Sequence, residues 1–259
     1  MKVVRYTVES DIGQRRSVNE DRATVISRSN NQIHLAIVAD GMGGHNAGDV
    51  ASTLTVEGFK ERFEQVDDEE FSTAANRKDW LFETVVDLNR HVYQYAMTHE
   101  NCTGMGTTLI AAVIVGNEAS ICHVGDSRAY HIDDETIEMI TRDHSYVNIL
   151  VDSGEISEEE AETHPKKNYI IKSLGTEDVI EPDFYEYTFK PNEYLLICSD
   201  GLTNKVNQQA LHKVITSWQS IDEKGKELVQ LANDHGGEDN ITVILAQPLG
   251  DGGAEVADR

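Results

Sequence analysis

Four aspartates stand beside apolar, strand-like runs of the sequence. Asp40 follows HLAIVA, Asp126 follows ASICHVG, Asp200 follows YLLICS, and Asp239 precedes Asn240 and ITVILA. An ionised carboxylate at the tip of a buried strand is costly unless it is paired or bound to a metal, and no Arg or Lys adjoins these acids. Carboxylates and backbone carbonyls are the ligands of Mg²⁺ or Mn²⁺, and Gly41 lets the backbone come close to an ion. The pattern therefore predicts a site for divalent cations.

Each acid taken alone has a simpler explanation, because Asp-Gly is a common turn signal and aspartate often caps helices. Glu20 and Asp21 would likewise be solvated surface if considered alone. Two strand-terminal Asp-Gly pairs, a Gly-Asp-Ser and a Gly-Gly-Glu-Asp-Asn in one chain favour the metal site. A calcium-binding structural protein is the weakest alternative because the sequence has no EF-hand loop, and a zinc site is disfavoured because it has no His/Cys ligand pattern.

The elements that must position these acids are strands that follow one another without intervening helices, which favours antiparallel pairing. We predict strands, from their β-branched runs, over residues 33–39, 107–115, 119–124, 129–132, 194–198 and 241–246. Helical periodicity predicts helices over 47–65 and 80–98, and two further apolar stripes at Leu211, Val214, Ile215 and Trp218 and at Leu228, Val229 and Ala232.

Two segments differ from this core. Residues 145–176, called the flap here, contain a capping-box pattern from Ser157 to Glu160 and a closing His164-Pro165, so we expect a small, mobile helical insert. The Gly-rich, acidic tail at 248–259 is expected to be disordered. Without an internal repeat or a central linker, residues 1–247 are expected to form a single domain.

The overall composition limits the possible partners and compartment. Forty-six acidic residues against 22 Lys and Arg give a net charge of -24, which disfavours nucleic acid and anionic membranes as partners. The three cysteines, Cys102, Cys122 and Cys198, have no CxxC spacing and are expected to be reduced core residues. No apolar signal region or membrane-length apolar stretch is present, so we expect a cytoplasmic protein.

Seven motifs in order along nearly the whole chain resemble those of the bacterial branch of the type-2C, metal-dependent serine/threonine protein phosphatases. They are DIGQRRSVNED at 11–21, VADGMGGH at 38–45, GMGTT at 104–108, HVGDSR at 123–128, DHS at 143–145, CSDGL at 198–202 and GEDNIT at 237–242. Each motif is weak alone, whereas the ordered set is specific. The resemblance implies an α+β fold, a four-layer αββα sandwich with two central antiparallel sheets and a small helical flap.

The resemblance also implies roles for particular residues. Asp40 would bridge two Mn²⁺ or Mg²⁺ ions, Gly41 would offer its carbonyl, and Asp200 and Asp239 would complete the site. Glu20 and Asp21 would act mainly through water, and Asp126 with Asp200 would hold a third, weaker ion. Arg16 matches the family's phosphate-binding arginine, a role that suits the planar guanidinium.

The implied activity is hydrolysis of phosphoserine and phosphothreonine in proteins by a metal-activated water, without a phosphoenzyme. The expected partners are phosphoprotein substrates, including a Ser/Thr protein kinase and its targets, and the expected state is a monomer. The alternative is a catalytically silent, metal-binding signalling module of the same fold. The intact set of Arg16, Asp40, Asp200 and Asp239 disfavours it.

One position departs from the family pattern. Met42 stands where many eukaryotic members have a histidine that is proposed to protonate the leaving group. A methionine cannot donate a proton, so protonation would come from bound water or from His45. A histidine such as His45 is more often structural. The flap is expected to affect substrate choice.

Overall fold

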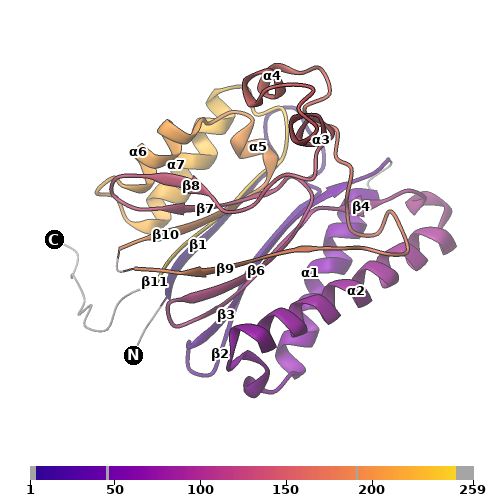
Figure 1. Cartoon of the computed structure of the whole chain (residues 1–259), viewed down its shortest axis with the longest axis horizontal. Helices are drawn as coiled ribbons and strands as arrows, with labels where there is room; N and C mark the ends of the chain where they lie inside the picture. The colour runs from indigo at the N-terminus through magenta and orange to yellow at the C-terminus, as the bar shows by residue number, and fades with distance from the viewer. Residues whose placement is uncertain (1–3, 45–46, 191, 249–259) are drawn as a thin grey trace.

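The computed structural model describes residues 4–44, 47–190 and 192–248. Two antiparallel sheets form the centre of the molecule, and helices cover their outer faces (Figure 1). This arrangement confirms the α+β sandwich expected from the resemblance. None of the described helices is long and apolar enough to cross a membrane.

The first sheet has five strands in the order β1-β11-β10-β7-β8. They span Val4–Asp11 (β1), Ile241–Pro248 (β11), Tyr194–Cys198 (β10), Arg128–Ile132 (β7) and Ile137–Met139 (β8). The second sheet has six strands, in the order β2-β3-β5-β6-β9 with β4 paired to β3. They span Asp21–Arg28 (β2), Ile33–Met42 (β3), Leu109–Val115 (β5), Glu118–Val124 (β6), Asp183–Thr188 (β9) and Gly106–Thr107 (β4).

Helices pack on both outer faces, as their apolar stripes require. Helices α1 (Ala47–Gln65) and α2 (Ala74–Thr98) cover the second sheet. Helices α5 (Asp200–Thr203), α6 (Gln208–Ile215) and α7 (Ile221–Asp234) cover the first. Short 3₁₀ helices occupy Asp68–Phe71 and Glu100–Cys102. The apolar layers under the helices and a third between the sheets make up the core.

The predicted elements need several corrections. The strand expected at 33–39 continues to Met42, and the one expected at 107–115 is divided at Thr108, whose backbone N–H donates to Asp40 O at 2.8 Å. Helix α2 begins earlier than expected, because Thr73 caps it by accepting from Asn76 N. Trp218 does not belong to the stripe of α6, which ends at Ile215, and its side chain is fully exposed.

The strands that were not predicted, β1, β2, β8 and β9, are the four outermost strands of the two sheets. Edge strands face solvent along one side, so polar residues interrupt their apolar runs. β2, for example, has one buried residue among eight, whereas β3 is buried over most of its length. The predicted strands β3, β5, β6, β7, β10 and β11 all lie inside the sheets.

The flap contains two short helices, α3 (Tyr146–Asp152) and α4 (Glu158–Thr163). The capping box predicted at Ser157 and Glu160 is present, and His164 follows the last helical residue. Helix α3 was not predicted. The tail expected to be disordered lies outside the described residues from 249 onward, whereas Pro248 still belongs to β11. All three cysteines are free and buried, as predicted.

Candidate metal centre

The predicted acids come from both sheets and lie at one end of the sandwich. Asp21 opens β2 and is the direct cross-strand partner of Asp40 on β3. Asp126 follows the β6 strand and Gly125, whose φ of 108° turns the chain toward β7. Asp200 is the first residue of α5, directly after β10, and Asp239 lies just before β11. Asp40 stands within β3 rather than after it, as the sequence had suggested.

The electrostatics show that these carboxylates act on one another. Burial and the charges of Asp21 and Asp200, then of Asp126 and Asp239, raise the pKa of Asp40 well above its ordinary value. Burial, with Asp239 and Asp21 nearby, raises the pKa of Asp200 to about 6. Burial likewise raises the pKa of Asp21 to about 6. Five acids in one place repel one another, and a divalent cation would remove the conflict.

Two carboxylate oxygens in this cluster are buried and have no hydrogen bond within the described part of the chain, namely Asp21 Oδ1 and Asp126 Oδ1. The second oxygen of Asp21 accepts from Ser199 Oγ at 2.8 Å, and Asp200 Oδ2 accepts from Asn204 Nδ2 at 2.9 Å. A buried oxygen without a partner loses several kcal/mol of hydration. The all-oxygen donor set and these unpartnered atoms therefore fit Mg²⁺ or Mn²⁺.

Gly41 is required by its packing against the start of α1. A Cβ at this position would lie 2.1 Å from Gly48 O and 2.7 Å from Glu20 O. The same contact places Glu20 beside the first backbone N–H groups of α1, at Gly48 and Asp49, which lower its pKa. Burial outweighs them, and the pKa of Glu20 is raised overall. Glu20 thus lies between the acidic cluster and the N-terminus of α1.

Arg16 lies at the rim of the cluster. Its Nη2 donates to Asp239 Oδ2 at 2.8 Å, and its Nη1 is 4.0 Å from Glu20 Oε2. The side chain is 45% exposed, so part of the guanidinium faces solvent and can receive a ligand. No Arg or Lys is adjacent to Asp239 in the sequence, but the fold supplies Arg16 as its cationic partner. The two residues are 223 positions apart, so no local pattern reveals the pair.

Sequence reasoning missed Asn240, which ties three segments together. Its Oδ1 accepts from Glu20 N at 2.8 Å, and its Nδ2 donates to Ile12 O at 2.9 Å and Val18 O at 3.0 Å. Its side chain is buried, so the loop that carries Arg16 and Glu20 is fixed against the residue that follows Asp239. Its place beside Asp239 in the Gly-Gly-Glu-Asp-Asn run was the available signal.

A second residue that sequence reasoning missed is Arg128. Its Nε donates to Asp143 Oδ1 at 3.0 Å and its Nη2 donates to Asp143 Oδ2 at 2.7 Å. This two-point ion pair fixes Asp143, two residues before the flap, to β7, the strand that follows Asp126. Burial, then Asp200 and Asp143, raises the pKa of Asp126 well above its usual range. The pair therefore positions the flap beside the acidic cluster.

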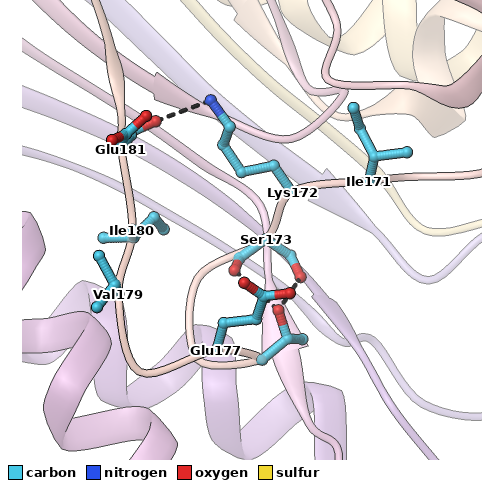
Figure 2. Close-up of a pocket in the computed structure, with 8 residues that line it drawn as sticks. Ile171, Lys172, Ser173, Glu177, Val179, Ile180 and Glu181 are labelled. Carbon is cyan, nitrogen blue, oxygen red and sulfur yellow. Dashed lines mark hydrogen bonds between the residues drawn. The ribbon is translucent and has the colours of Figure 1, made fainter. Parts of the chain in front are cut away.

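The flap rejoins the sheets beside a pocket. Thr107 and Leu174 exchange two backbone hydrogen bonds, of 3.0 and 2.9 Å, which hold the end of the flap against β4. Figure 2 shows the pocket beyond this point, lined by Ile171, Lys172, Ser173, Thr176, Glu177, Val179, Ile180 and Glu181. Lys172 Nζ donates across it to Glu181 O at 2.8 Å.

Met42 ends β3 at the cluster, whereas His45 lies outside the described residues.

Comparisons with known proteins agree with this geometry. The sequence model of the family described as "Protein phosphatase 2C" matches residues 13–236. The serine/threonine phosphatase stp of Listeria monocytogenes is 40% identical over 238 residues, which cover 92% of this chain and 93% of that protein.

Solved structures are similar as well. The serine/threonine phosphatase Stp1 of Staphylococcus aureus superposes with a TM-score of 0.88 at 38% identity, over 96% of this chain and 98% of that one. The serine/threonine phosphatase PstP/Ppp of Mycobacterium tuberculosis gives a TM-score of 0.85 at 34% identity, over 96% of this chain and 100% of that one.

Proposed function

This chain belongs to the protein phosphatase 2C family, and from that premise we propose that it hydrolyses phosphoserine and phosphothreonine in proteins at the acidic cluster around Asp40. The observation that carries the proposal is the convergence of five aspartates from both sheets beside a half-exposed Arg16. The matched relatives are themselves serine/threonine phosphatases, which argues for a catalytic protein and against a silent binding module.

The family is metal-dependent, and we assign the metal ligands from the donor set of this chain. Asp40 and the Gly41 carbonyl, with Asp200 and Asp239, would hold two Mn²⁺ or Mg²⁺ ions, and Glu20 and Asp21 would act mainly through water. Asp126 and Asp200 would hold a third, weaker ion, consistent with the unpartnered Asp126 Oδ1. Bound there, the ions would lower the pKa of water and neutralise charge that develops on the phosphoryl group.

The protein's own residues then bind and orient the substrate. Arg16 presents its free guanidinium N–H groups to the phosphate oxygens, and Asp239 holds the guanidinium in place through the 2.8 Å bond. Asn240 fixes the loop of Arg16 to the end of the first sheet. Met42 has no transferable proton, so it plays no part in leaving-group protonation.

The remaining functional assignments follow from the proposed activity. A phosphoprotein phosphatase opposes a kinase, so the partners would be a Ser/Thr protein kinase and its targets, within signal transduction in the cytoplasm. Residues 1–247 would act as a single domain and as a monomer. The flap, fixed beside the cluster by Arg128 and Asp143, would influence which phosphoproteins bind.

Phosphate release from a phosphothreonine peptide tests the proposal. We expect turnover with Mn²⁺ and none after EDTA, and a loss of roughly a thousandfold for Asp40→Asn, since a metal site supplies several kcal/mol of transition-state stabilisation. Asp79→Asn, at an exposed acid of α2, is the matched control and should keep full activity. Turnover that persists in EDTA, or in Asp40→Asn, would contradict the proposal.

A further inference from the structure

A second group of possible metal ligands lies at the opposite end of the sandwich from the acidic cluster. His131 is on β7, Asp133 follows that strand, and Glu193 precedes β10. One ligand atom from each lies within 4.8 Å of the other two. Tyr194 pairs with Ile132 across the two strands, which places Glu193 opposite Asp133, and the two-residue spacing puts His131 on the same face. The β7–β8 turn lies away from α3 and α4 (Figure 1).

His131 carries a buried nitrogen that needs a partner. Its side chain is 8% exposed, and within the described residues Nε2 makes no hydrogen bond. This atom points toward Glu193 Oε1, which lies 3.3 Å away. The separation matches the roughly 3.4 Å between two ligand atoms on a tetrahedral zinc ion with bonds of about 2.1 Å.

The two carboxylates are already oriented by hydrogen bonds that leave one oxygen of each available. Glu193 Oε2 accepts from Tyr187 Oη at 3.0 Å and from Lys190 N at 2.7 Å, so Oε1 remains to face His131. Asp133 Oδ1 accepts from Glu135 N at 2.9 Å and Thr136 N at 2.6 Å, which leaves Oδ2. Such outer hydrogen bonds are the usual supports of metal ligands.

The charge around this group also suits a cation. Glu193 is 3% exposed and Asp133 stands beside it, so two negative charges share one partly buried place. Lys190 Nζ lies 3.8 Å from Glu193 Oε1, and His212 Nε2 lies 3.0 Å from the backbone oxygen of Asp133. The Lys190 side chain is 81% exposed and can turn into solvent when a cation arrives.

We propose that His131, Asp133 and Glu193 bind a divalent transition-metal ion, with Zn²⁺ as the preferred class, at a structural site separate from the catalytic cluster. Imidazole nitrogens and carboxylate oxygens are both zinc ligands, and water can supply the fourth position of a tetrahedral ion. Mg²⁺ prefers oxygen ligands alone, so it would select the catalytic cluster instead. The bound ion would join the β7–β8 turn to the loop that precedes β10.

Zinc binding in the presence of saturating Mg²⁺ tests the site. The metal-stripped full chain is loaded with Mg²⁺ and titrated with Zn²⁺, while long-range ¹H–¹⁵N NMR follows the histidine rings. We expect the His131 ring signals to shift on zinc binding. The His131→Gln variant should bind one equivalent of Zn²⁺ less than the wild type, and zinc should raise its melting temperature less.

Asp133→Asn keeps the Oδ1 acceptor of the turn and removes only the charge, so it tests the site even if the His131 variant does not fold. We expect it to weaken Zn²⁺ binding by at least about tenfold. Asp134→Asn, at the exposed neighbouring acid, is the matched control and should bind like the wild type. Unmoved His131 signals, or equal zinc binding by Asp133→Asn and the wild type, would show that His131 and Glu193 form an ordinary ion pair.

Discussion

The two ends of the sandwich place carboxylates in opposite situations. At the end that carries the acidic cluster, burial and mutual repulsion raise the pKa of Asp40, Asp126 and Asp200. At the other end, backbone N–H groups of Glu135 and Thr136 lower the pKa of Asp133, and the unpartnered atom is a histidine nitrogen. The difference teaches which cation each end would select: the all-oxygen end suits a hard cation, and the end that adds an imidazole nitrogen to two carboxylates suits the zinc ion proposed above.

The largest effect that would sharpen this contrast is expected for Arg16→Ala. Loss of the charged donors that face the phosphate should lower kcat/KM by roughly 10- to 100-fold, as expected for a charge-assisted pair worth about 1.5–3 kcal/mol. Steady-state assays with a phosphothreonine peptide measure the loss. Arg15→Ala, at the exposed neighbouring residue, is the control and should leave kcat/KM unchanged.

A smaller effect concerns the stability of the metal-free enzyme. Because the folded-state pKa values of Asp21 and Asp200 are raised to about 6 from 3.8, protonation stabilises the fold below pH 4, and this contribution is lost as the pH rises through 6. The melting temperature in EDTA should therefore fall by several degrees between pH 4 and 7. Mn²⁺ should restore it at pH 7.

Asp200→Asn supplies the control for this measurement, because an amide has no proton to lose in this range. Its melting temperature in EDTA should fall less between pH 4 and 7 than that of the wild type. If the melting temperatures of the two proteins fell equally between pH 4 and 7, ionisation of Asp200 would not destabilise the metal-free fold. That result would contradict the contrast between the two ends of the sandwich.

The smallest effect is expected for His45→Ala. His45 stands three residues beyond Met42, and a histidine at such a position is more often a structural residue than a general acid. The variant should keep the wild-type kcat and the same acid limb of the pH–rate profile. A shifted acid limb would instead identify His45 as the proton donor for the leaving group.

The strands inside the two sheets could be predicted from the sequence, whereas the strands at the sheet edges could not. The strand β3 reads as a continuous apolar run because both of its faces are covered, whereas β1, β2, β8 and β9 each lie at a sheet edge where polar residues are tolerated. Helix α1 was predicted with its observed bounds from its small-residue stripe. Trp218 was misassigned because an apolar stripe does not show where a helix ends.

The two groups of possible metal ligands, around Asp40 and around His131, also differed in how far the sequence could predict them. The acids around Asp40 were predicted to form one site because each stands beside a buried strand, and the structure places them together; their roles as ligands remain proposals. The bond between Arg16 and Asp239 and the group of His131 and Glu193 depend on which strands pair. Pairing is a property of the whole fold and leaves no local signal.

The pairing of β1 with β11, in which Ser10 lies opposite Thr242, brings the two extremes of the chain together. A nascent chain emerging from the ribosome therefore holds Arg16 and Glu20 early but cannot complete the proposed catalytic site until Asp239 and β11 have been synthesised. Contacts of such long sequence separation also slow folding. Partly synthesised enzyme should thus remain inert toward phosphoproteins.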